Sequence, residues 1–310
     1  MSERDVERLL DMKEVVHSVE EAFRREALGE ATNFMRTRSK GTGAVLNVMH
    51  ASLSYLGRGG LKAYMSTNAG TKFVVVLFDT ADSTPLAMMG ADYLGRFRTG
   101  AVSGVATKHL YGKPSATLAL FGSGKQALTQ VLAVSAVTSV QEVRVWSPNP
   151  GHREAFARKL VGLGFTANAF DSPQQALDGS QVACAITSAT EPFLDDRSLN
   201  GVEHLNLCGG NNPEHAEIAP EAVAAFGTVV VDDLLQAKVE YGDLIQATQA
   251  GRFSWDSAVE LKDVVGRKFK PRGRTLFKSG GVALEDVAVA SMLFDKASKS
   301  GESFAEVELV

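Results

Sequence analysis

An apolar run that ends in a glycine turn constrains the fold of this chain more than any other feature. Residues 117–127 read Thr-Leu-Ala-Leu-Phe-Gly-Ser-Gly-Lys-Gln-Ala, so a G-x-G-x-x-A pattern follows the apolar residues directly. A helix-competent segment, residues 126–137, comes next. A strand, glycine turn and helix start in this order are typical of dinucleotide-binding folds. Gly122 permits the tight turn, Gly124 lets the backbone approach the pyrophosphate, and Ala127 keeps the helix close to the strand.

The segment around this turn alternates strands and helices. We expect strands at residues 117–121, 143–146, 166–170, 182–187, 204–207 and 228–231, and helices near 126–137, 153–163, 173–178 and 220–225. Continuous apolar strands that alternate with helices predict a parallel sheet covered on both faces. The sequence therefore predicts an α/β fold class, with a Rossmann-type doubly wound parallel sheet over residues 115–282.

Residues 1–114 have a different pattern, which predicts a β-rich domain with two helices. Asp11 is a plausible N-cap for a helix whose apolar residues recur at helical spacing until Gly29. Extended runs follow at 44–49, 61–66 and 73–78, separated by the glycines of residues 57–60 and by residues 68–70, and residues 91–110 form a long helix. A last helix near 283–298 is expected to pack on this domain, so that residues 1–114 and 283–310 form one domain.

Composition excludes several classes of function. The formal net charge of −4 gives no reason to expect nucleic acid or an anionic membrane as a partner. No apolar run approaches the roughly 20 residues that span a bilayer, and the charged N-terminus lacks a signal region, so we expect a cytoplasmic protein. Cys184 and Cys208 lie in apolar runs and are interpreted as small core residues. They predict no metal site, since no histidine pair lies near them, and a redox role stays open.

The strand after the glycine turn bears on the choice of nucleotide. It ends in Trp146-Ser147-Pro148-Asn149, where NAD-preferring sites usually carry Asp or Glu. No carboxylate would repel a 2′-phosphate here, and His152 or Arg153 could attract one. We therefore favour NADP(H) over NAD(H) as the cofactor. The alternative interpretation is that Arg153 is a solvated residue on the next helix.

Several further motifs occur in a fixed order along nearly the whole chain. They are Phe97-Arg98-Thr99-Gly100-Ala101, the turn at 120–127, Thr190-Glu191-Pro192, and Phe277-Lys278-Ser279-Gly280 before Leu284-Glu285-Asp286. With them the chain resembles the ornithine cyclodeaminase/μ-crystallin family, which includes alanine dehydrogenases and cyclic imine reductases. The resemblance implies a homodimer whose first domain supplies the dimer interface and the substrate groove. It also implies a small amino-acid or imino-acid substrate whose α-carbon exchanges hydride with the cofactor.

The resemblance also implies which residues bind the substrate carboxylate, namely Arg36, Lys62 and Arg98. Guanidinium groups suit a carboxylate because they bind it with two hydrogen bonds. Lys62 lies in an apolar strand and Arg98 in a helix of small residues, where a charge without a purpose would be costly. A lysine beside a second cation can have a lowered pKa, and Lys62 could then transfer a proton. The alternative is that these residues are surface charges.

Three departures from the family pattern weigh on the reaction. Asn211 stands where the cyclodeaminases and alanine dehydrogenases have an acid/base aspartate, and an amide cannot take a proton at neutral pH. Asn47 stands where ornithine-specific members have a glutamate. His50 replaces a proline and is either a proton donor or a structural histidine. These changes favour reduction of a preformed imine, with Lys62, Asn211 and His50 as catalytic candidates.

Two other functions stay open at this point. One is an ornithine cyclodeaminase or alanine dehydrogenase in which Asn211 or His50 has an unusual role. The other is a non-catalytic, crystallin-like protein that binds NADPH.

The family pattern places Thr99 near the phosphates and assigns most other cofactor contacts to four regions of the chain. These are the glycine turn, the end of the next strand at the adenosine ribose, the switch point of the sheet, and the nicotinamide side, with Asp232 alternatively a helix cap. The predicted cofactor-binding residues are Thr71, Arg98, Thr99, Gly122, Ser123, Gly124, Lys125, Gln126, Ser147, Asn149, Arg153, Thr187, Ser188, Asp232, Lys278, Ser279 and Gly280.

Overall fold

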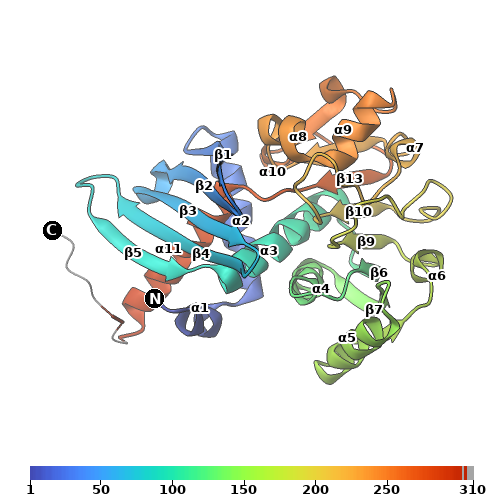
Figure 1. The fold of residues 1–310 in the computed structure, drawn as a ribbon, viewed down its shortest axis with the longest axis horizontal. Coiled ribbons are helices and arrows are strands. Elements are labelled where there is room, and N and C mark those ends of the chain that lie inside the picture. Colours follow the sequence, from blue (N-terminus) through green and yellow to red (C-terminus); the bar gives the residue numbers. More distant parts are fainter. Residues whose placement is uncertain (302–303, 306–310) are drawn as a thin grey trace. The chain divides into compact units, whose positions relative to one another are not determined.

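The computed structural model describes residues 1–301 and 304–305 and divides the chain into two compact units (Figure 1). The first unit consists of Met1–Arg98 and the segment that begins at Val282, and the second of Thr99–Gly281. The boundary falls inside helix α3 (Asp92–Leu110), whereas the predicted domain boundary follows this helix. Each unit has its own sheet and its own core.

The first unit contains a five-stranded antiparallel sheet with the strand order β1-β2-β3-β4-β5. Met49, Lys62, Val75 and Met89 are cross-strand partners in successive strands, so their side chains share one face, which is buried. The strands are β1 (Ala31–Gly41), β2 (Ala44–Leu53), β3 (Arg58–Thr67), β4 (Gly70–Asp79) and β5 (Pro85–Gly90), with a 3-10 turn η1 (Ser54–Leu56) before β3.

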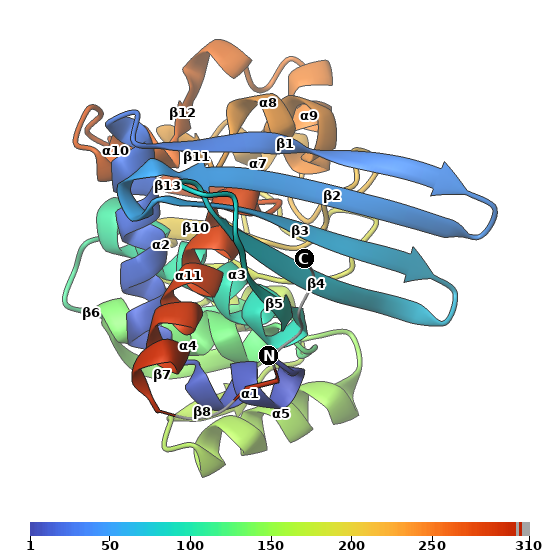
Figure 2. The same cartoon turned by 90° about the vertical axis from the view of Figure 1, so that its left-hand side faces the viewer.

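Helices cover this buried face of the sheet, and Figure 2 shows α2 (Met12–Ala27) and α11 (Ala283–Lys299) side by side against it. Asp11 caps α2 as predicted, because its carboxylate accepts from the N–H groups of Lys13 and Glu14 at 2.9 and 3.1 Å. Helix α11 is fixed at its start, where the N–H of Leu284 donates to Asn33 Oδ1 at 3.2 Å. A short helix, α1 (Glu3–Leu9), precedes α2.

The opposite face of the sheet carries apolar side chains that this unit leaves exposed. Leu46 and Met65 are cross-strand partners with exposed fractions of 37% and 43%. Phe34 and Met88 are exposed by 52% and 61%. Large apolar side chains exposed on one face of a sheet are typical of interaction sites in folded proteins.

The second unit contains an eight-stranded parallel sheet with the order β12-β11-β13-β10-β9-β6-β7-β8. The sequential run β8-β7-β6-β9-β10 is the Rossmann order 3-2-1-4-5, which confirms the predicted fold class. The strands are β6 (Ser115–Phe121), β7 (Ser139–Trp146), β8 (Ala167–Ala169), β9 (Val182–Ala185), β10 (His204–Leu207), β11 (Thr228–Val231), β12 (Ala258–Glu260) and β13 (Thr275–Lys278).

Both faces of this sheet are covered, because successive residues of β6 belong to different core clusters. Leu118 and Leu120 pack in one cluster, and Ala119 and Phe121 in the other. The covering elements are α4 (Ala127–Val137), α5 (Pro150–Gly162), α6 (Pro173–Leu177), α7 (Pro220–Val223), α8 (Leu234–Glu240), α9 (Gly242–Gln249), η2 (Trp255–Ser257) and α10 (Leu261–Val265).

Glycines bring α3 and α4 into backbone contact. A Cβ on Gly100 would lie 2.3 Å from the carbonyl oxygen of Thr129, and one on Gly104 would lie 2.8 Å from that of Ala133. The side chain of Gln130 donates to the carbonyl of Thr99 at 3.3 Å in the same contact. The helix that follows the glycine turn is thus held firmly against α3.

The structure adds elements to those predicted from the sequence. Strand β1 was not predicted, because at the edge of the sheet only Ala31 and Arg36 are buried and no apolar alternation results. Gly59 and Gly60 lie within β3, and a Cβ on Gly60 would come 2.8 Å from the carbonyl oxygen of Val76. The short elements α1, β5, β12, β13 and α8–α10 were also missed.

Candidate active site

A cavity of about 880 Å³ opens in the second unit between the carboxyl ends of β6, β7 and β9. This is where the strand order reverses, the usual place for a dinucleotide in such a sheet. Predicted cofactor residues that line the cavity are Gly122, Ser123, Gly124, Lys125, Gln126, Ser147, Asn149, Thr187 and Ser188. Those outside its lining are Thr71, Arg98, Thr99, Arg153, Asp232, Lys278, Ser279 and Gly280.

The two glycines of the turn have different reasons to be glycine. Gly122 has a φ of 106°, and a Cβ there would lie 2.6 Å from the carbonyl oxygen of Ile186. The folded backbone itself therefore requires glycine at this position. A Cβ on Gly124 would meet nothing within 4 Å, so its backbone borders open space. The turn thus fits a pyrophosphate that approaches Gly124 in front of the α4 N-terminus.

The loop between β7 and α5 forms the side of the cavity where the adenosine ribose is expected. Ser123 Oγ donates to Ser147 Oγ at 3.0 Å, and Asn149 Oδ1 accepts from the N–H of His152 at 3.0 Å. Arg153 is buried, donates to the carbonyl of Ser147 at 3.2 Å, and forms an ion pair with Asp171. Arg153 therefore stabilises this loop without lining the cavity, whereas His152 does line it. The solvated alternative for Arg153 is wrong.

A buried ionic network lies under the cavity floor. Glu217 Oε1 accepts from the N–H and hydroxyl of Thr187 at 2.8 and 2.6 Å, and Oε2 accepts from the N–H of Gly209 at 3.1 Å. Lys278 Nζ lies 2.7 Å from Asp243 Oδ2 and donates to the carbonyls of Gly209 and Gly210 at 3.1 and 3.3 Å. These contacts fix the loop that carries the partly buried Asn211.

The charges of this network support one another. Burial raises the pKa of Glu217, while the Lys278 ammonium opposes that shift. Burial alone would lower the pKa of Lys278, but the carboxylates of Asp243 and Glu217 raise it above its ordinary value. Lys278 is therefore a charged structural clamp on the 209–210 backbone.

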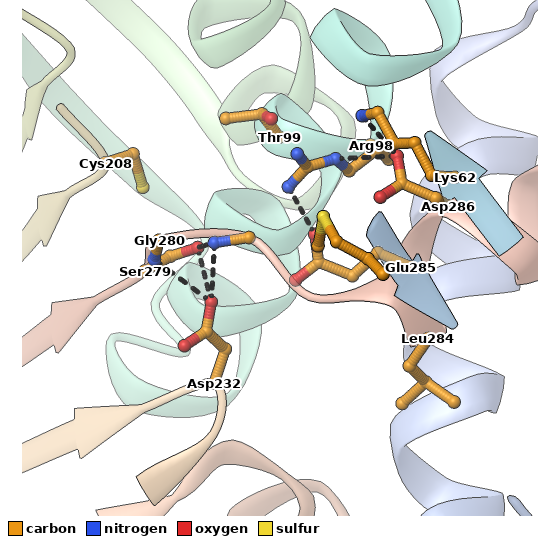
Figure 3. Close-up of polar contacts among 12 residues, drawn as sticks. Lys62, Arg98, Thr99, Cys208, Asp232, Ser279, Gly280, Leu284, Glu285 and Asp286 are labelled. Atoms are coloured by element: carbon orange, nitrogen blue, oxygen red, sulfur yellow. Dashed lines mark hydrogen bonds and ion pairs between the residues drawn. The ribbon is translucent and has the colours of Figure 1, made fainter. Parts of the chain in front are cut away.

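Asp232 organises the turn that follows β13, as Figure 3 shows. Its Oδ2 accepts from Ser279 Oγ at 2.8 Å and from the N–H groups of Gly280 and Gly281 at 3.2 and 3.0 Å. The Tyr241 hydroxyl donates to Oδ1. The alternative role of Asp232 as a helix cap is wrong, because the neighbouring Asp233 caps α8.

In the first unit, Lys62 and Arg98 form ion pairs with two neighbouring acidic residues of α11 (Figure 3). Lys62 Nζ lies 2.8 Å from Asp286 Oδ1, and Arg98 Nε lies 3.1 Å from the same oxygen. Arg98 Nη1 lies 2.8 Å from Glu285 Oε2. All four side chains are buried, so Lys62 and Arg98 are not surface charges.

The surroundings of Lys62 make its ammonium acidic. Burial lowers the pKa of Lys62 to about 8, with Arg98 and Arg36 adding to this shift and Asp286 opposing it. Arg36 is itself buried and donates through Nε to Met49 Sδ at 3.4 Å. Since Met49 is the cross-strand partner of Lys62, Arg36 reaches the same face of the sheet.

The other predicted residues of the first unit make separate contacts, although Asn47 lies two residues before Met49 on the same face of β2. Asn47 is buried, and its amide donates to the Val45 carbonyl of its own strand at 3.3 Å. His50 is on the opposite face, exposed and stacked on Phe34 at 4.5 Å between ring centroids. Thr71 is at the start of β4, where its hydroxyl donates to Oγ of its cross-strand partner Ser66 at 3.1 Å. The structure does not bring His50 to Lys62.

Sequence reasoning missed the acidic partners of both clusters. Glu285 and Asp286 lie between Leu284 and Val287 in the apolar first half of α11, and Glu217 lies between Ala216 and Ile218. Asp243 similarly precedes Leu244 and Ile245. A carboxylate within an apolar run is the signal that could have found them, because such charges are seldom buried without a partner.

Both cysteines are free thiols in the second unit. Burial raises the pKa of Cys184 to about 12, and burial likewise raises the pKa of Cys208, whose Sγ lies 3.1 Å from Ser103 Oγ. Thiols this weakly acidic are poor nucleophiles at neutral pH. Within residues 1–301 and 304–305, no cluster of His, Cys, Asp and Glu suits a metal ion and no helix is long and apolar enough to cross a bilayer.

Comparison with known proteins relates this geometry to one family. The model of the ornithine cyclodeaminase/mu-crystallin family matches residues 1–301. A Delta(1)-pyrroline-2-carboxylate reductase of Bacillus cereus is 32% identical over 74% of this chain and 72% of its own length. Among solved structures, the Thermococcus litoralis Delta(1)-pyrroline-2-carboxylate reductase in complex with NADH and L-proline has a TM-score of 0.90, with 29% identity over 97% of this chain and 98% of its own. An archaeal alanine dehydrogenase dimer with bound NAD also has a TM-score of 0.90, with 26% identity over 100% and 98% of the two chains.

Proposed function

This chain belongs to the ornithine cyclodeaminase/mu-crystallin family, and we propose that it is an NAD(P)H-dependent reductase of imines that carry an α-carboxylate. The observation that carries the proposal is the buried cluster of Lys62, Arg98 and Asp286, with Arg36 on the same face of the sheet. The solved and curated relatives that reduce pyrroline-2-carboxylate support this reaction class.

The charge of the cluster suits a substrate with a single carboxylate. Three cationic side chains, Arg36, Lys62 and Arg98, stand against the two carboxylates of Glu285 and Asp286, so the formal charge is positive by one when Lys62 is protonated. One α-carboxylate neutralises that charge, and guanidinium groups suit a carboxylate as partners. Asn47 carries no negative charge, so it cannot form an ion pair with an ammonium group at the far end of a substrate side chain.

The reaction needs a hydride for the imine carbon and a proton for its nitrogen. A reduced nicotinamide, when bound, would supply the hydride and would itself be oxidised. Lys62 supplies the proton, because an ammonium with a pKa of about 8 gives it up far more readily than an ordinary lysine. The C=N double bond becomes C–H and N–H, and no ammonia is released. The amide of Asn211 exchanges no proton at neutral pH, so the proton is assigned to Lys62.

We propose that the dinucleotide binds in the cavity beside the glycine turn and that NADP(H) is preferred over NAD(H). The support is the end of β7, where Ser147 and Asn149 stand in place of a carboxylate and His152 lines the cavity. Arg153 gives no support, since it is bonded to Ser147 and Asp171 behind the loop. Related structures hold NADH or NAD, so both nucleotides belong in every assay.

The exposed apolar face of the first unit is proposed to bind a second copy of this chain. Leu46, Met65 and Met88 are large apolar side chains that solvent reaches in the single chain. The related alanine dehydrogenase is a dimer. A homodimer would cover this face and remove the cost of its exposure.

A panel of substrates separates this function from its alternatives. With pyrroline-2-carboxylate or piperideine-2-carboxylate, the proposed reductase oxidises NADPH or NADH in step with formation of the cyclic amino acid. Proline formed from ornithine without added reductant would instead indicate a cyclodeaminase, and activity confined to pyruvate with ammonia an alanine dehydrogenase. Binding of NADPH without turnover on any imine or keto acid would indicate a non-catalytic protein.

A further inference from the structure

A single carboxylate oxygen joins the two cations of the substrate site. Asp286 Oδ1 accepts from Lys62 Nζ at 2.8 Å and from Arg98 Nε at 3.1 Å. Asp286 is fully buried, and its Oδ2 has no hydrogen-bond partner among the described residues. A buried, half-satisfied carboxylate is costly for stability, which is typical of a residue retained for function.

The fold holds this carboxylate in place from three sides. Asp286 lies in the first turn of α11, where the helix dipole favours a negative charge. The hydrogen bond from Leu284 N–H to Asn33 Oδ1 ties this turn to β1. On α3, a Cβ at Gly95 would lie 3.1 Å from Lys62 Nζ, so glycine leaves the room in which the ammonium meets Asp286.

We propose that Asp286 is the positioning residue of this site, holding the proton-donating ammonium of Lys62 and the carboxylate-binding guanidinium of Arg98 on one oxygen. The proposal rests on the proposed imine reductase function. It gives the site a carboxylate in the first unit, although Asn211 has replaced the aspartate that other family members use. Binding of the substrate carboxylate and donation of the proton are then coupled through Asp286.

The groups around Lys62 fix the direction of the expected effect. Asp286 on α11 favours the ammonium, whereas Arg98 on α3 and Arg36 on β1 disfavour it. From β4 the ring of Phe73 faces the ammonium at 5.3 Å, and its interaction with a cation also favours the charged form. Removing the charge of Asp286 therefore leaves Lys62 with two repelling cations and a still lower pKa.

The test is the pH profile of kcat/KM for imine reduction in Asp286→Asn. We expect the alkaline limb to move to lower pH by about 1–3 units, the usual effect of one adjacent opposite charge. Asp286→Glu restores the charge and returns the limb towards the wild-type position. Asp295→Asn is the matched control, since Asp295 is on the same helix and pairs with Arg58; its limb stays in place. If the alkaline limb of Asp286→Asn lies at the same pH as that of the wild-type enzyme, the proposal is overturned.

Thermal unfolding tests the same pair without reference to activity. Asp286→Asn leaves the Lys62 ammonium buried without its partner, so the double variant with Lys62→Met is expected to be the more stable of the two. If Asp286→Asn does not fold, recovery of folded protein in the double variant likewise supports the pairing of Lys62 with Asp286. If the double variant is no more stable than Asp286→Asn, the proposed pairing of Lys62 with Asp286 is overturned. Absence of imine reduction in the wild type would refute the proposed function alone, since this comparison would still decide the role of Asp286.

Discussion

Among single residues, Lys62 is the one on which the proposed chemistry depends. Its ammonium is buried between Asp286 and two arginines, and its pKa is lowered to about 8. Because the protonated form donates, we predict that kcat/KM for imine reduction falls as pH rises through about 8. An ordinary lysine would stay charged to a pH of about 10. The pH dependence of the wild-type enzyme measures this directly.

Replacement of Lys62 separates proton transfer from binding. We predict that Lys62→Met lowers kcat by about 10²–10⁴-fold, the usual contribution of a general acid, and removes the limb near pH 8. Steady-state kinetics with saturating NADPH provides the measurement. An unchanged kcat with only a raised KM would show that Lys62 binds the substrate carboxylate and transfers no proton.

The two glycines of the turn offer a matched pair of variants. Gly122→Ala forces a Cβ against the Ile186 carbonyl at a φ of 106°, so we predict a loss of unfolding free energy of about 1–3 kcal/mol or more. Gly124→Ala meets no protein atom within 4 Å. It should keep the stability of the wild-type protein and weaken NADPH binding by roughly tenfold, about 1.4 kcal/mol. Equal affinity in Gly124→Ala would mean that no phosphate approaches this backbone.

At the scale of elements, the buried network of Glu217, Asp243 and Lys278 joins the ends of β9, β10 and β13. Glu217→Gln removes an acceptor from the N–H of Gly209 or from Thr187, and a charge from Lys278. We predict a loss of about 3–5 kcal/mol in unfolding free energy and weaker NADPH binding, because Thr187 lines the cavity. Urea unfolding and a fluorescence titration measure the two effects.

The control for this network is an exposed glutamate nearby in sequence. Glu221 on α7 forms a long, exposed contact of 3.8 Å with Arg252. Exposed pairs contribute little, so Glu221→Gln should match the wild-type protein in both measurements. If Glu217→Gln behaved as this control does, the loop at 209–211 would be held by other contacts.

The same elements show what a sequence can predict. The apolar run at the end of β6 and the cap of α2 at Asp11 are local signals, and both were found. The pairing of Lys62 with Asp286 spans 224 positions and arises only when α11 packs on the sheet. The spacing of apolar residues along the sequence carries no information about such a long-range contact. The role of Arg153 was likewise hidden, since its partner Asp171 follows the next strand.

At the scale of the whole molecule, the exposed face of the antiparallel sheet predicts association. Met65→Glu places a charge on that face, opposite Leu46 on the neighbouring strand. We predict that this variant is a monomer in light scattering after size exclusion, while the wild-type chain is a dimer. Val161→Glu on α5, where the valine is 56% exposed, should remain a dimer. If the wild-type chain is a monomer, the proposal that this face binds a second copy of the chain is contradicted.

The most direct measurement of the central claim is the stoichiometry of imine reduction by the purified wild-type protein. Pyrroline-2-carboxylate is mixed with NADPH, and separately with NADH, while nicotinamide absorbance and proline are both followed. We predict one proline formed for each reduced nucleotide consumed, with the faster rate for NADPH and a decline of kcat/KM above about pH 8. Tight nucleotide binding with no absorbance change on this or any other cyclic or linear α-carboxylate imine would contradict this prediction.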